Sequence, residues 1–180
     1  LYIAGHNGLA VIDVTDPAAM SLIGEHDLGG ILSVDDMHVV GGIVYLANGG
    51  LKILDASAPS NITLLGSMDT EANGLFVVND VAFIAAGEDG VRAINVADPA
   101  SLIEANTFGP DHELVAQREA DSIFVQNDIA YVGAKGTVQV WDVQDLANPK
   151  FLGQTISRTR TDGLVVQDQL AYAVGKSGLE

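Results

Sequence analysis

Four side chains with oxygen atoms recur at one place in the sequence, ten residues before an aromatic residue. They are Asp35, Asn73, Asp121 and Asp162, and the aromatic residues are Tyr45, Phe83, Tyr131 and Tyr172. Oxygen ligands of this kind suit Ca²⁺ or Mg²⁺. Carboxylates brought together raise one another's pKa values unless a cation or hydrogen-bond donors compensate. The plainer role, which the sequence favours, is to bond backbone N–H groups of the adjacent loop. The alternative hypothesis, which assigns a ligand, is a calcium site at Asp35, Asp121 and Asp162.

Other polar side chains do not recur and are further candidates for ligand contacts. Asp36 adds a second carboxylate beside the first recurring one, and His26 falls in a connection between repeats. His112 lies in an insertion over residues 107–119 that the other repeats lack, and that insertion has room for one or two helical turns. Long loops on a rigid scaffold are where function concentrates, so this insertion is a candidate binding segment.

Two arginines form a separate candidate. Arg158 and Arg160 are one residue apart, and no other repeat has a counterpart. On an extended segment such side chains point the same way, which would suit a carboxylate or a sulfate. They can equally be solvated loop residues.

The elements that must position these side chains repeat along the chain. The unit is an aromatic residue, a Gly turn, an alternating apolar run closed by Asp or Asn, a Pro turn and a short apolar pair. Tyr172 lies 170 residues after Tyr2, which makes four periods of about 42 residues. In the second unit the expected strands are 37–40, 44–47, 51–55 and 63–66, here called strands A to D.

Four short strands in each unit of about 42 residues predict an all-β chain folded as a β-propeller. Gly41-Gly42 and Asn79-Asp80 predict tight A–B hairpins, because these residues tolerate positive φ. A β-sandwich with regularly spaced strands is the alternative, but it gives no reason for whole four-strand units to recur. In a propeller, the B–C loops and D–A connections share one face, here called the loop face. The starts of the strands A, with the four recurring oxygen side chains, ring the channel mouth on that face.

The strand C segments resemble the LVIVD repeat family. The residues that carry the resemblance are Val11-Ile12-Asp13-Val14, Ile53-Leu54-Asp55-Ala56 and Val140-Trp141-Asp142-Val143. The resemblance implies a propeller of an extracellular or cell-envelope protein, often beside other modules. It implies no catalytic motif. The third copy departs from the pattern, because Asn95 replaces the Asp and the insertion lengthens the unit.

Residues that recur in every unit have structural explanations. Asp13, Asp55, Asn95 and Asp142 are predicted to fix the C–D turns by bonding backbone N–H groups two residues on. The aromatic residues of strand B are predicted to pack between blades. Trp141 takes the place of Ile12, Leu54 and Ile94, so it is expected in the core. His38 aligns with Phe76, Phe124 and Val165, so it is predicted to be a packing residue and not a ligand.

Composition excludes several classes of function. Lys and Arg number 8 against 24 Asp and Glu, which gives a net charge of −16 and argues against nucleic acid or an anionic membrane surface as partner. No Cys is present, so disulfides and thiol catalysis are excluded. No apolar run is long enough for membrane insertion, and no signal peptide is visible.

The units give partial blades at residues 1–30 and 159–178 and complete repeats at 31–71, 72–115 and 116–158, with 179–180 a candidate cloning scar. About four repeats are present, and strand B occurs at both ends, so completing one blade leaves a strand over. We therefore expect part of a larger ring. The alternatives are remaining blades lost by truncation, or a second copy that closes the ring.

The sequence favours a non-enzymatic scaffold that binds protein or glycan on the loop face, in an extracellular or cell-envelope protein. The alternative is a fragment of a propeller hydrolase or polysaccharide lyase in which His26 or His112 and the mouth carboxylates act as acid and base. The chain has no Gly-x-Ser-x-Gly motif, phosphate loop or His-Glu-x-x-His motif.

Overall fold

The computed structural model describes residues 1–29, 33–109, 119–156, 160–175 and 178–179. The insertion residue His112, Arg158 and the helical turns expected near 111–118 lie outside the described residues. Within the described part, no helix is long and apolar enough to cross a membrane.

The described strands form five antiparallel sheets in chain order, and the three central sheets have four strands each. The first sheet contains β1 (Tyr2–Gly5), β2 (Gly8–Asp13) and β3 (Ser21–His26). The second contains β4 (Asp36–Val40), β5 (Ile43–Ala47), β6 (Leu51–Asp55) and β7 (Thr63–Met68). The third contains β8 (Gly74–Val78), β9 (Val81–Ala85), β10 (Val91–Asn95) and β11 (Ile103–Phe108). The fourth contains β12 (Ala120–Gln126), β13 (Ile129–Ala134), β14 (Thr137–Asp142) and β15 (Lys150–Ile156). The fifth contains β16 (Gly163–Gln167), β17 (Leu170–Gly175) and β18 (Gly178–Leu179), and a 3₁₀ turn, η1 (Pro59–Asn61), precedes β7.

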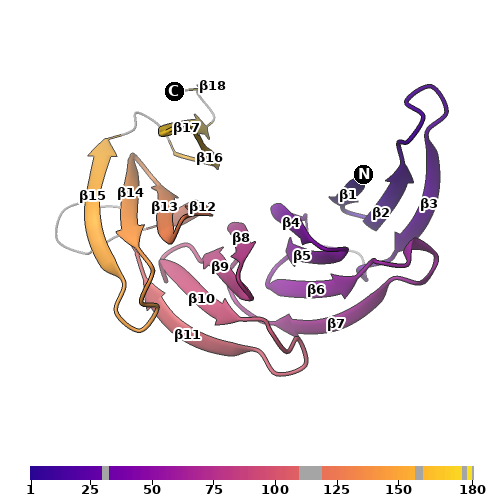
Figure 1. Cartoon of the computed structure of the whole chain (residues 1–180), viewed down its shortest axis with the longest axis horizontal. Helices are drawn as coiled ribbons and strands as arrows, with labels where there is room; N and C mark the ends of the chain where they lie inside the picture. Colours follow the sequence, from indigo (N-terminus) through magenta and orange to yellow (C-terminus); the bar gives the residue numbers. More distant parts are fainter. Residues whose placement is uncertain (30–32, 110–118, 157–159, 176–177, 180) are drawn as a thin grey trace.

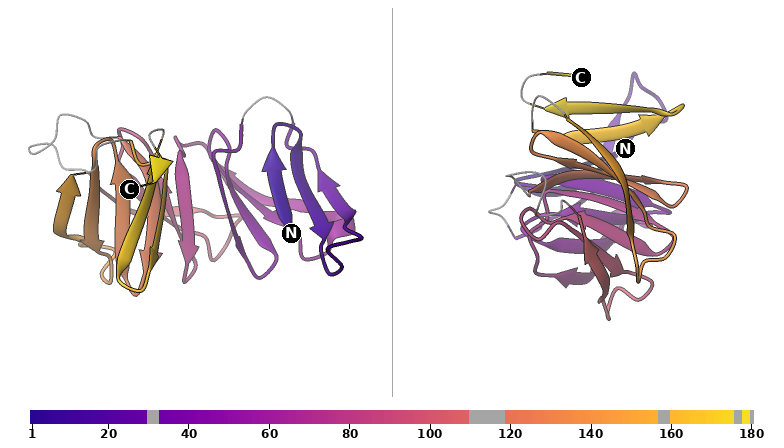
Figure 2. Two further views of the ribbon diagram at one scale, coloured as in Figure 1. Left: turned by 90° about the horizontal axis from the view of Figure 1, so that it is seen from above. Right: turned by 90° about the vertical axis from the view of Figure 1, so that its left-hand side faces the viewer.

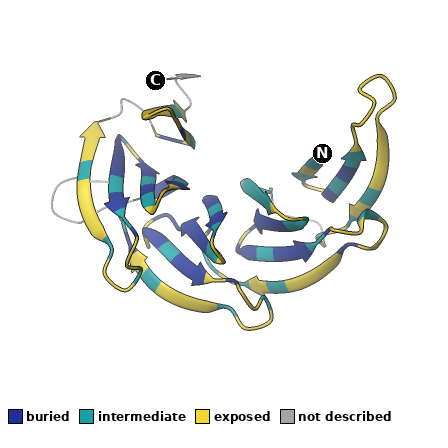
Figure 3. Ribbon diagram, viewed as in Figure 1, coloured by how far each residue is buried: buried dark blue, intermediate teal, exposed yellow. Residues whose placement is uncertain are grey.

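The sheets stand side by side as the blades of an open arc, with the first and fifth sheets at its two ends (Figure 1). Strands β4, β8 and β12 take the inner, strand A place, and β3, β7, β11 and β15 form the outer edge (Figure 1). The outer strands are largely exposed, whereas the strands between them and the channel are mostly buried (Figure 3). The arrangement confirms the predicted blades and leaves the arc without closure.

The A–B hairpins close with the predicted turn residues. Both central residues have positive φ in all four described A–B hairpins. The values are 50° and 58° for Asn79 and Asp80, 52° and 60° for Asn127 and Asp128, 59° and 89° for Gly41 and Gly42, and 50° and 66° for Asp168 and Gln169. This conformation matches the right-handed twist of the flanking strands. The turns therefore fix the register of the paired strands. This register decides which apolar side chains of each strand face each side of the blade.

The C–D turns also form as predicted, because the residue that closes strand C accepts a hydrogen bond from the N–H two residues on. The N···O distances are 2.9 Å for Thr15 to Asp13, 2.9 Å for Ser57 to Asp55, 3.0 Å for Ala97 to Asn95 and 3.0 Å for Gln144 to Asp142. The hydroxyls of Thr15 and Ser57 also donate to Asp13 and Asp55, and these bonds lower the pKa of both carboxyls. The recurring acids thus have a structural role in the turns.

Apolar clusters join neighbouring blades. Tyr45 and Ile53 of the second sheet pack with Ile84 and Ile94 of the third. In the next joint Phe83 packs with Trp141 of the fourth sheet. Tyr45 and Phe83 therefore lie between blades, as predicted, whereas Tyr172 in the fifth sheet is 40% exposed. Trp141 is a core residue, as predicted.

Candidate functional site

The recurring oxygen side chains at the channel mouth have different environments. Asp35 and Asp162 are exposed and Asn73 is half-buried. Their backbone N–H groups bond the carbonyl oxygens that end strand B, at 2.9 Å to Ala47, 2.9 Å to Val174 and 2.8 Å to Ala85 respectively. The same backbone bond repeats at these three positions, and Asp121 differs from them in its burial.

Asp121 lies in a β-bulge and is only 2% exposed. The register between β12 and β13 shifts between Ala120 and Ser122, so one residue has no partner across the ladder. Besides its partner Ala134 in the ladder, the Ala120 backbone pairs with Gly87 of the preceding blade, with N···O distances of 2.8 and 3.1 Å. Asp121 is therefore buried beside the bulge, whereas its counterparts Asp35 and Asp162 are exposed.

Arg160 connects two of the carboxylates. Its Nη2 lies 2.5 Å from Oδ1 of Asp121, and its Nε lies 3.2 Å from Oδ1 of Asp162. The contact to Asp121 is an ion pair, and both carboxylate oxygens of Asp121 are buried. Burial raises the pKa of Asp121, and the Arg160 charge opposes this shift. The cation expected between these carboxylates is thus provided by the chain itself.

The segment that contains Thr161 is held by a second contact between the fourth and fifth sheets. Ser122 Oγ donates to the carbonyl of Thr161 at 2.7 Å, and Thr161 is buried. Gly133 allows this approach, because a Cβ there would lie 2.2 Å from Ser122 Oγ and 2.7 Å from Thr161 Cγ2. The change from Ala47 and Ala85 to Gly133 was a visible sequence signal for this contact.

Asp36 and His38 join the inner strands of the second and third sheets. Asp36 Oδ2 accepts from the N–H of Leu75 at 2.8 Å, and His38 Nδ1 accepts from the N–H of Val77 at 2.7 Å. The His38 and Phe76 ring centroids are 4.5 Å apart. His38 is therefore a packing residue, as predicted, and Asp36 holds two blades together in place of a ligand.

The His38 contact predicts a pH-dependent stability. Desolvation lowers the pKa of His38, against an opposing effect of Asp36. Because the pKa is lower in the folded state, the contribution of His38 is complete above about pH 6.5 and is lost as the pH falls below that value. The loss is at most about 1.4 kcal/mol per pH unit. Urea unfolding of the wild type and His38→Phe from about pH 8 to 5.5 measures it.

His38→Phe matches the side chains of the neighbouring blades but cannot titrate. The free energy of unfolding of the wild type should therefore decrease relative to that of His38→Phe as the pH falls. A difference that stays constant through this range would contradict a neutral, hydrogen-bonded His38.

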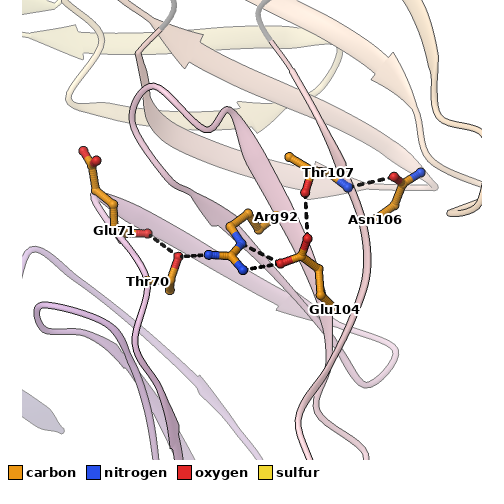
Figure 4. A network of polar contacts seen from close by, with 6 residues as sticks. All are labelled: Thr70, Glu71, Arg92, Glu104, Asn106 and Thr107. Carbon is orange, nitrogen blue, oxygen red and sulfur yellow. Dashed lines mark hydrogen bonds and ion pairs between the residues drawn. The ribbon is translucent and has the colours of Figure 1, made fainter.

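A polar network lies on the loop-face side of the third sheet. Arg92 Nε and Nη2 both contact Oε2 of Glu104, the former at 2.6 Å, and Nη1 donates to Oγ1 of Thr70 at 2.7 Å (Figure 4). Thr107 Oγ1 also donates to Oε1 of Glu104 at 2.9 Å. The Arg92 hydrogen bond is the main cause of the lowered pKa of Glu104. The network links β10 to β11 and to Thr70 in the preceding connection. It also pairs one of the few cations on this face with a carboxylate.

The remaining candidates are not brought together. His26 ends β3 in the first sheet, whereas Asp121 begins the inner strand of the fourth, and the two sheets stand apart in the arc (Figure 1). Among residues 1–29, 33–109, 119–156, 160–175 and 178–179, no group of three or more His, Cys, Asp or Glu could hold a metal ion. The described mouth is therefore an acidic rim, with one buried carboxylate paired to an arginine.

The comparisons identify the repeat. A family model described as the LVIVD repeat matches residues 1–27, 33–70 and 117–155, which is more than half of the chain. The chain belongs to the LVIVD-repeat family. No curated protein sequence matches this LVIVD-repeat chain.

Similar solved structures support the β-propeller fold of this LVIVD-repeat chain. BamB from Moraxella catarrhalis is similar with a TM-score of 0.70 and 16% identity, over 99% of this chain and 52% of BamB. A functionally unknown protein from Desulfotomaculum acetoxidans gives 0.72 and 14%, over 99% and 63% of the two chains. The computationally designed Ika8 gives 0.67 and 16%, over 97% and 51%. The LVIVD-repeat chain thus spans about half the length of BamB and Ika8.

Proposed function

We propose that this chain is a non-enzymatic repeat scaffold that binds a protein or glycan on the loop face of an extracellular or cell-envelope protein. The observation that carries the proposal is the set of exposed acidic side chains on that face. These are Asp35, Asp69, Glu71, Glu88, Asp89 and Asp162. They come from B–C loops and D–A connections of successive blades, so rigid sheets hold them at regular intervals around the mouth.

The charge of this face favours a basic segment of a protein as the partner. The chain carries a net charge of −16, and like-charge repulsion disfavours anionic glycans. Arg160 and Arg92, two of the cations near this face, are paired with carboxylates of the chain and offset little of this field. Electrostatic complementarity mainly raises the association rate and selects the partner. A calcium ion is not part of the proposal, because Arg160 already pairs with both Asp121 and Asp162.

Binding is favoured over hydrolysis or lyase chemistry because the candidate acid and base do not meet. Asp121 is paired with Arg160, and His26 lies in a different sheet. A general base must lie within hydrogen-bond reach of the proton that it takes. In the described part of the loop face, charged side chains lie close together, but no candidate acid and base lie within reach of each other.

The test compares two sets of neutralised acids on opposite faces. Asp35→Asn, Asp69→Asn and Glu88→Gln change the loop face. Asp80→Asn, Asp128→Asn and Asp168→Asn change the A–B turns at the other face, where Asn tolerates the positive φ. The two faces are the opposite sides of the arc in the side view (Figure 2). Both triple variants remove the same charge, so only its location differs.

Fluorescence anisotropy with an arginine-rich peptide and with a neutral oligosaccharide, over a salt series, measures binding. We expect the loop-face variant to bind the peptide at least about tenfold more weakly and with a smaller salt dependence, and the turn variant to bind like the wild type. Equal weakening by both variants would show a nonspecific charge effect and would contradict a loop-face site. Oligosaccharide binding lost only in the loop-face variant would identify a glycan partner.

A further inference from the structure

A cavity of about 200 Å³ lies between the third and fourth sheets, on the face that carries the A–B hairpins. Its floor is apolar, because Phe83, Val125 and Val143 are buried side chains. Its rim is polar and consists of the exposed residues Asn79, Asp128 and Gln144. Both sheets have four strands, so the cavity belongs to a joint between two complete blades.

Contacts within and between the two sheets hold the walls of the cavity. The N–H of Val143 donates to the carbonyl oxygen of Asp128 at 2.8 Å, which ties the A–B hairpin of the fourth sheet to its C–D turn. Nδ2 of Asn106 in β11 donates to the carbonyl oxygens of Leu146 and Ala147 in the same turn, at 2.9 and 3.2 Å. The C–D turn is therefore fixed to the third sheet.

The C–D turns of the two preceding joints are fixed at the same place on the outer strand. A Cβ on Gly24 of β3 would lie 1.9 Å from the carbonyl oxygen of Pro59. A Cβ on Gly66 of β7 would lie 1.8 Å from the carbonyl oxygen of Pro99. Asn106 has the same place in its ladder as Gly66. The cavity is therefore not the result of a displaced turn.

The joint between the second and third sheets has a different aromatic residue at the position of Phe83. The counterpart of Phe83 is Tyr45, and the counterpart of Asp128 is Asp80, since each Asp is the second residue of its A–B turn. Tyr45 is buried between the blades, and this burial and the charge of Asp80 raise the pKa of its hydroxyl. The Tyr45 hydroxyl thus lies near the carboxylate of the A–B turn.

Phe83 is the one strand B aromatic residue without a hydroxyl. The other strand B aromatic residues are Tyr2, Tyr45, Tyr131 and Tyr172. The cavity therefore combines an apolar floor and a turn carboxylate with open space where the second sheet provides a phenol oxygen. Within the part of the chain that the structure describes, the side chains of Asn79, Asp128 and Gln144 form no hydrogen bond or ion pair.

We propose that this cavity binds a phenol group, carried by a small molecule or by a tyrosine side chain of another protein. The ring packs on the apolar floor, and the hydroxyl donates to the Asp128 carboxylate. The side-chain amide of Asn79 or Gln144 donates to the phenol oxygen. A space of about 200 Å³ suits one aromatic ring, because pockets for drug-sized ligands begin at about 300 Å³.

Amide NMR spectra of the wild type, titrated with p-cresol to about 10 mM, test the site. The amide signals of Asn79, Asp128 and Gln144 are expected to shift in a saturable way. Toluene lacks the hydroxyl and should bind at least about tenfold more weakly, because a hydrogen bond to a charged group is lost. Signals that do not respond to p-cresol, or equal binding of toluene, would overturn the proposal.

Two variants locate the phenol in the cavity. Phe83→Tyr should abolish p-cresol binding, because its own hydroxyl takes the place of the ligand, and it should fold because tyrosine occupies this position in the other sheets. Asp128→Asn tolerates the positive φ and should weaken binding about fivefold, because a neutral acceptor replaces a charged one. Phe151→Tyr, at an exposed position of β15 outside the cavity, is the matched control and should bind like the wild type. Undiminished binding by either of the first two variants would contradict the assignment.

A capped Gly-Tyr-Gly peptide distinguishes the two sources of the phenol. A peptide that shifts the same amide signals and displaces p-cresol would identify a tyrosine side chain of a partner protein as the ligand. Binding of p-cresol without binding of the peptide would identify a free phenol. The cavity lies on the face opposite the loop face, so its test is independent of the acidic site proposed there.

Discussion

Replacing Trp141 by alanine should lower the free energy of unfolding by about 3–5 kcal/mol. Trp141 is 9% exposed and lies in the cluster that joins the third and fourth sheets. Its ring centroid is 5.5 Å from that of Phe108 and 5.3 Å from that of Phe151. The substitution leaves a cavity between two blades, because the surrounding strands are tied by their ladders and cannot collapse into it.

The loss includes a polar contribution. Trp141 Nε1 donates to Oε1 of Gln139 at 3.1 Å, and Gln139 is buried. Removing the donor leaves that oxygen without its partner, which adds to the cost of the cavity. Urea unfolding, followed by circular dichroism, measures the total.

The matched control is Trp141→Leu, because Leu54 occupies this position in the second sheet. It should cost clearly less than Trp141→Ala, since it refills part of the cavity. A loss for Trp141→Ala of only about 0.5 kcal/mol, as at a surface position, would show that the indole does not join the blades.

Gly66→Ala should separate the second and third blades and is expected to cost at least the ~1–3 kcal/mol typical of overpacking. The added Cβ would lie 1.8 Å from the carbonyl oxygen of Pro99, and both partners are backbone atoms. No side-chain rotation can relieve this contact. The sheets must move apart, which opens the cluster containing Ile53 and Ile94.

Gly153→Ala is the matched control for this prediction. Its backbone register is the same, but nothing lies within 4 Å of the added Cβ. Its unfolding free energy should stay within about 0.5 kcal/mol of that of the wild type. Thermal or urea unfolding of both variants decides the matter, and equal losses would mean that the glycines serve only the strands themselves.

The sequence was sufficient to predict features that each blade builds from its own residues. The Asn79-Asp80 hairpin and the bond from Ala97 to Asn95 involve neighbours in the chain, so local residue types determine them. The repeat also predicted Tyr45 and Phe83 between blades, because a position that is apolar in every unit is buried wherever a neighbouring blade covers it. His38 was interpreted correctly by the same alignment.

The features that the sequence did not predict depend on contacts between blades. Asp121 was expected at the channel mouth with Asp35 and Asp162, and Arg160 does bring it close to Asp162, but its burial was not predicted. The pairing of Ser122 with Gly133 repeats that of Asp36 with Ala47, so the strand register alone does not distinguish this position. The contacts that set Asp121 apart come from Gly87 in the preceding blade and from Arg160 after the fourth sheet, so they could not be predicted without the structure.

In the joints between blades a C–D turn packs on the preceding outer strand, and this has a consequence for how the number of blades can change. Each joint needs an outer-strand residue that accommodates the turn, which is Gly24, Gly66 or Asn106, and a C–D turn in the following unit. Both are encoded within a single repeat. A gene duplication that copies one unit therefore copies both halves of the joint, so blades can be gained or lost singly without new compensating substitutions. The number of blades in a lineage is then limited by the curvature at which the ring closes, and not by the chemistry of the joints.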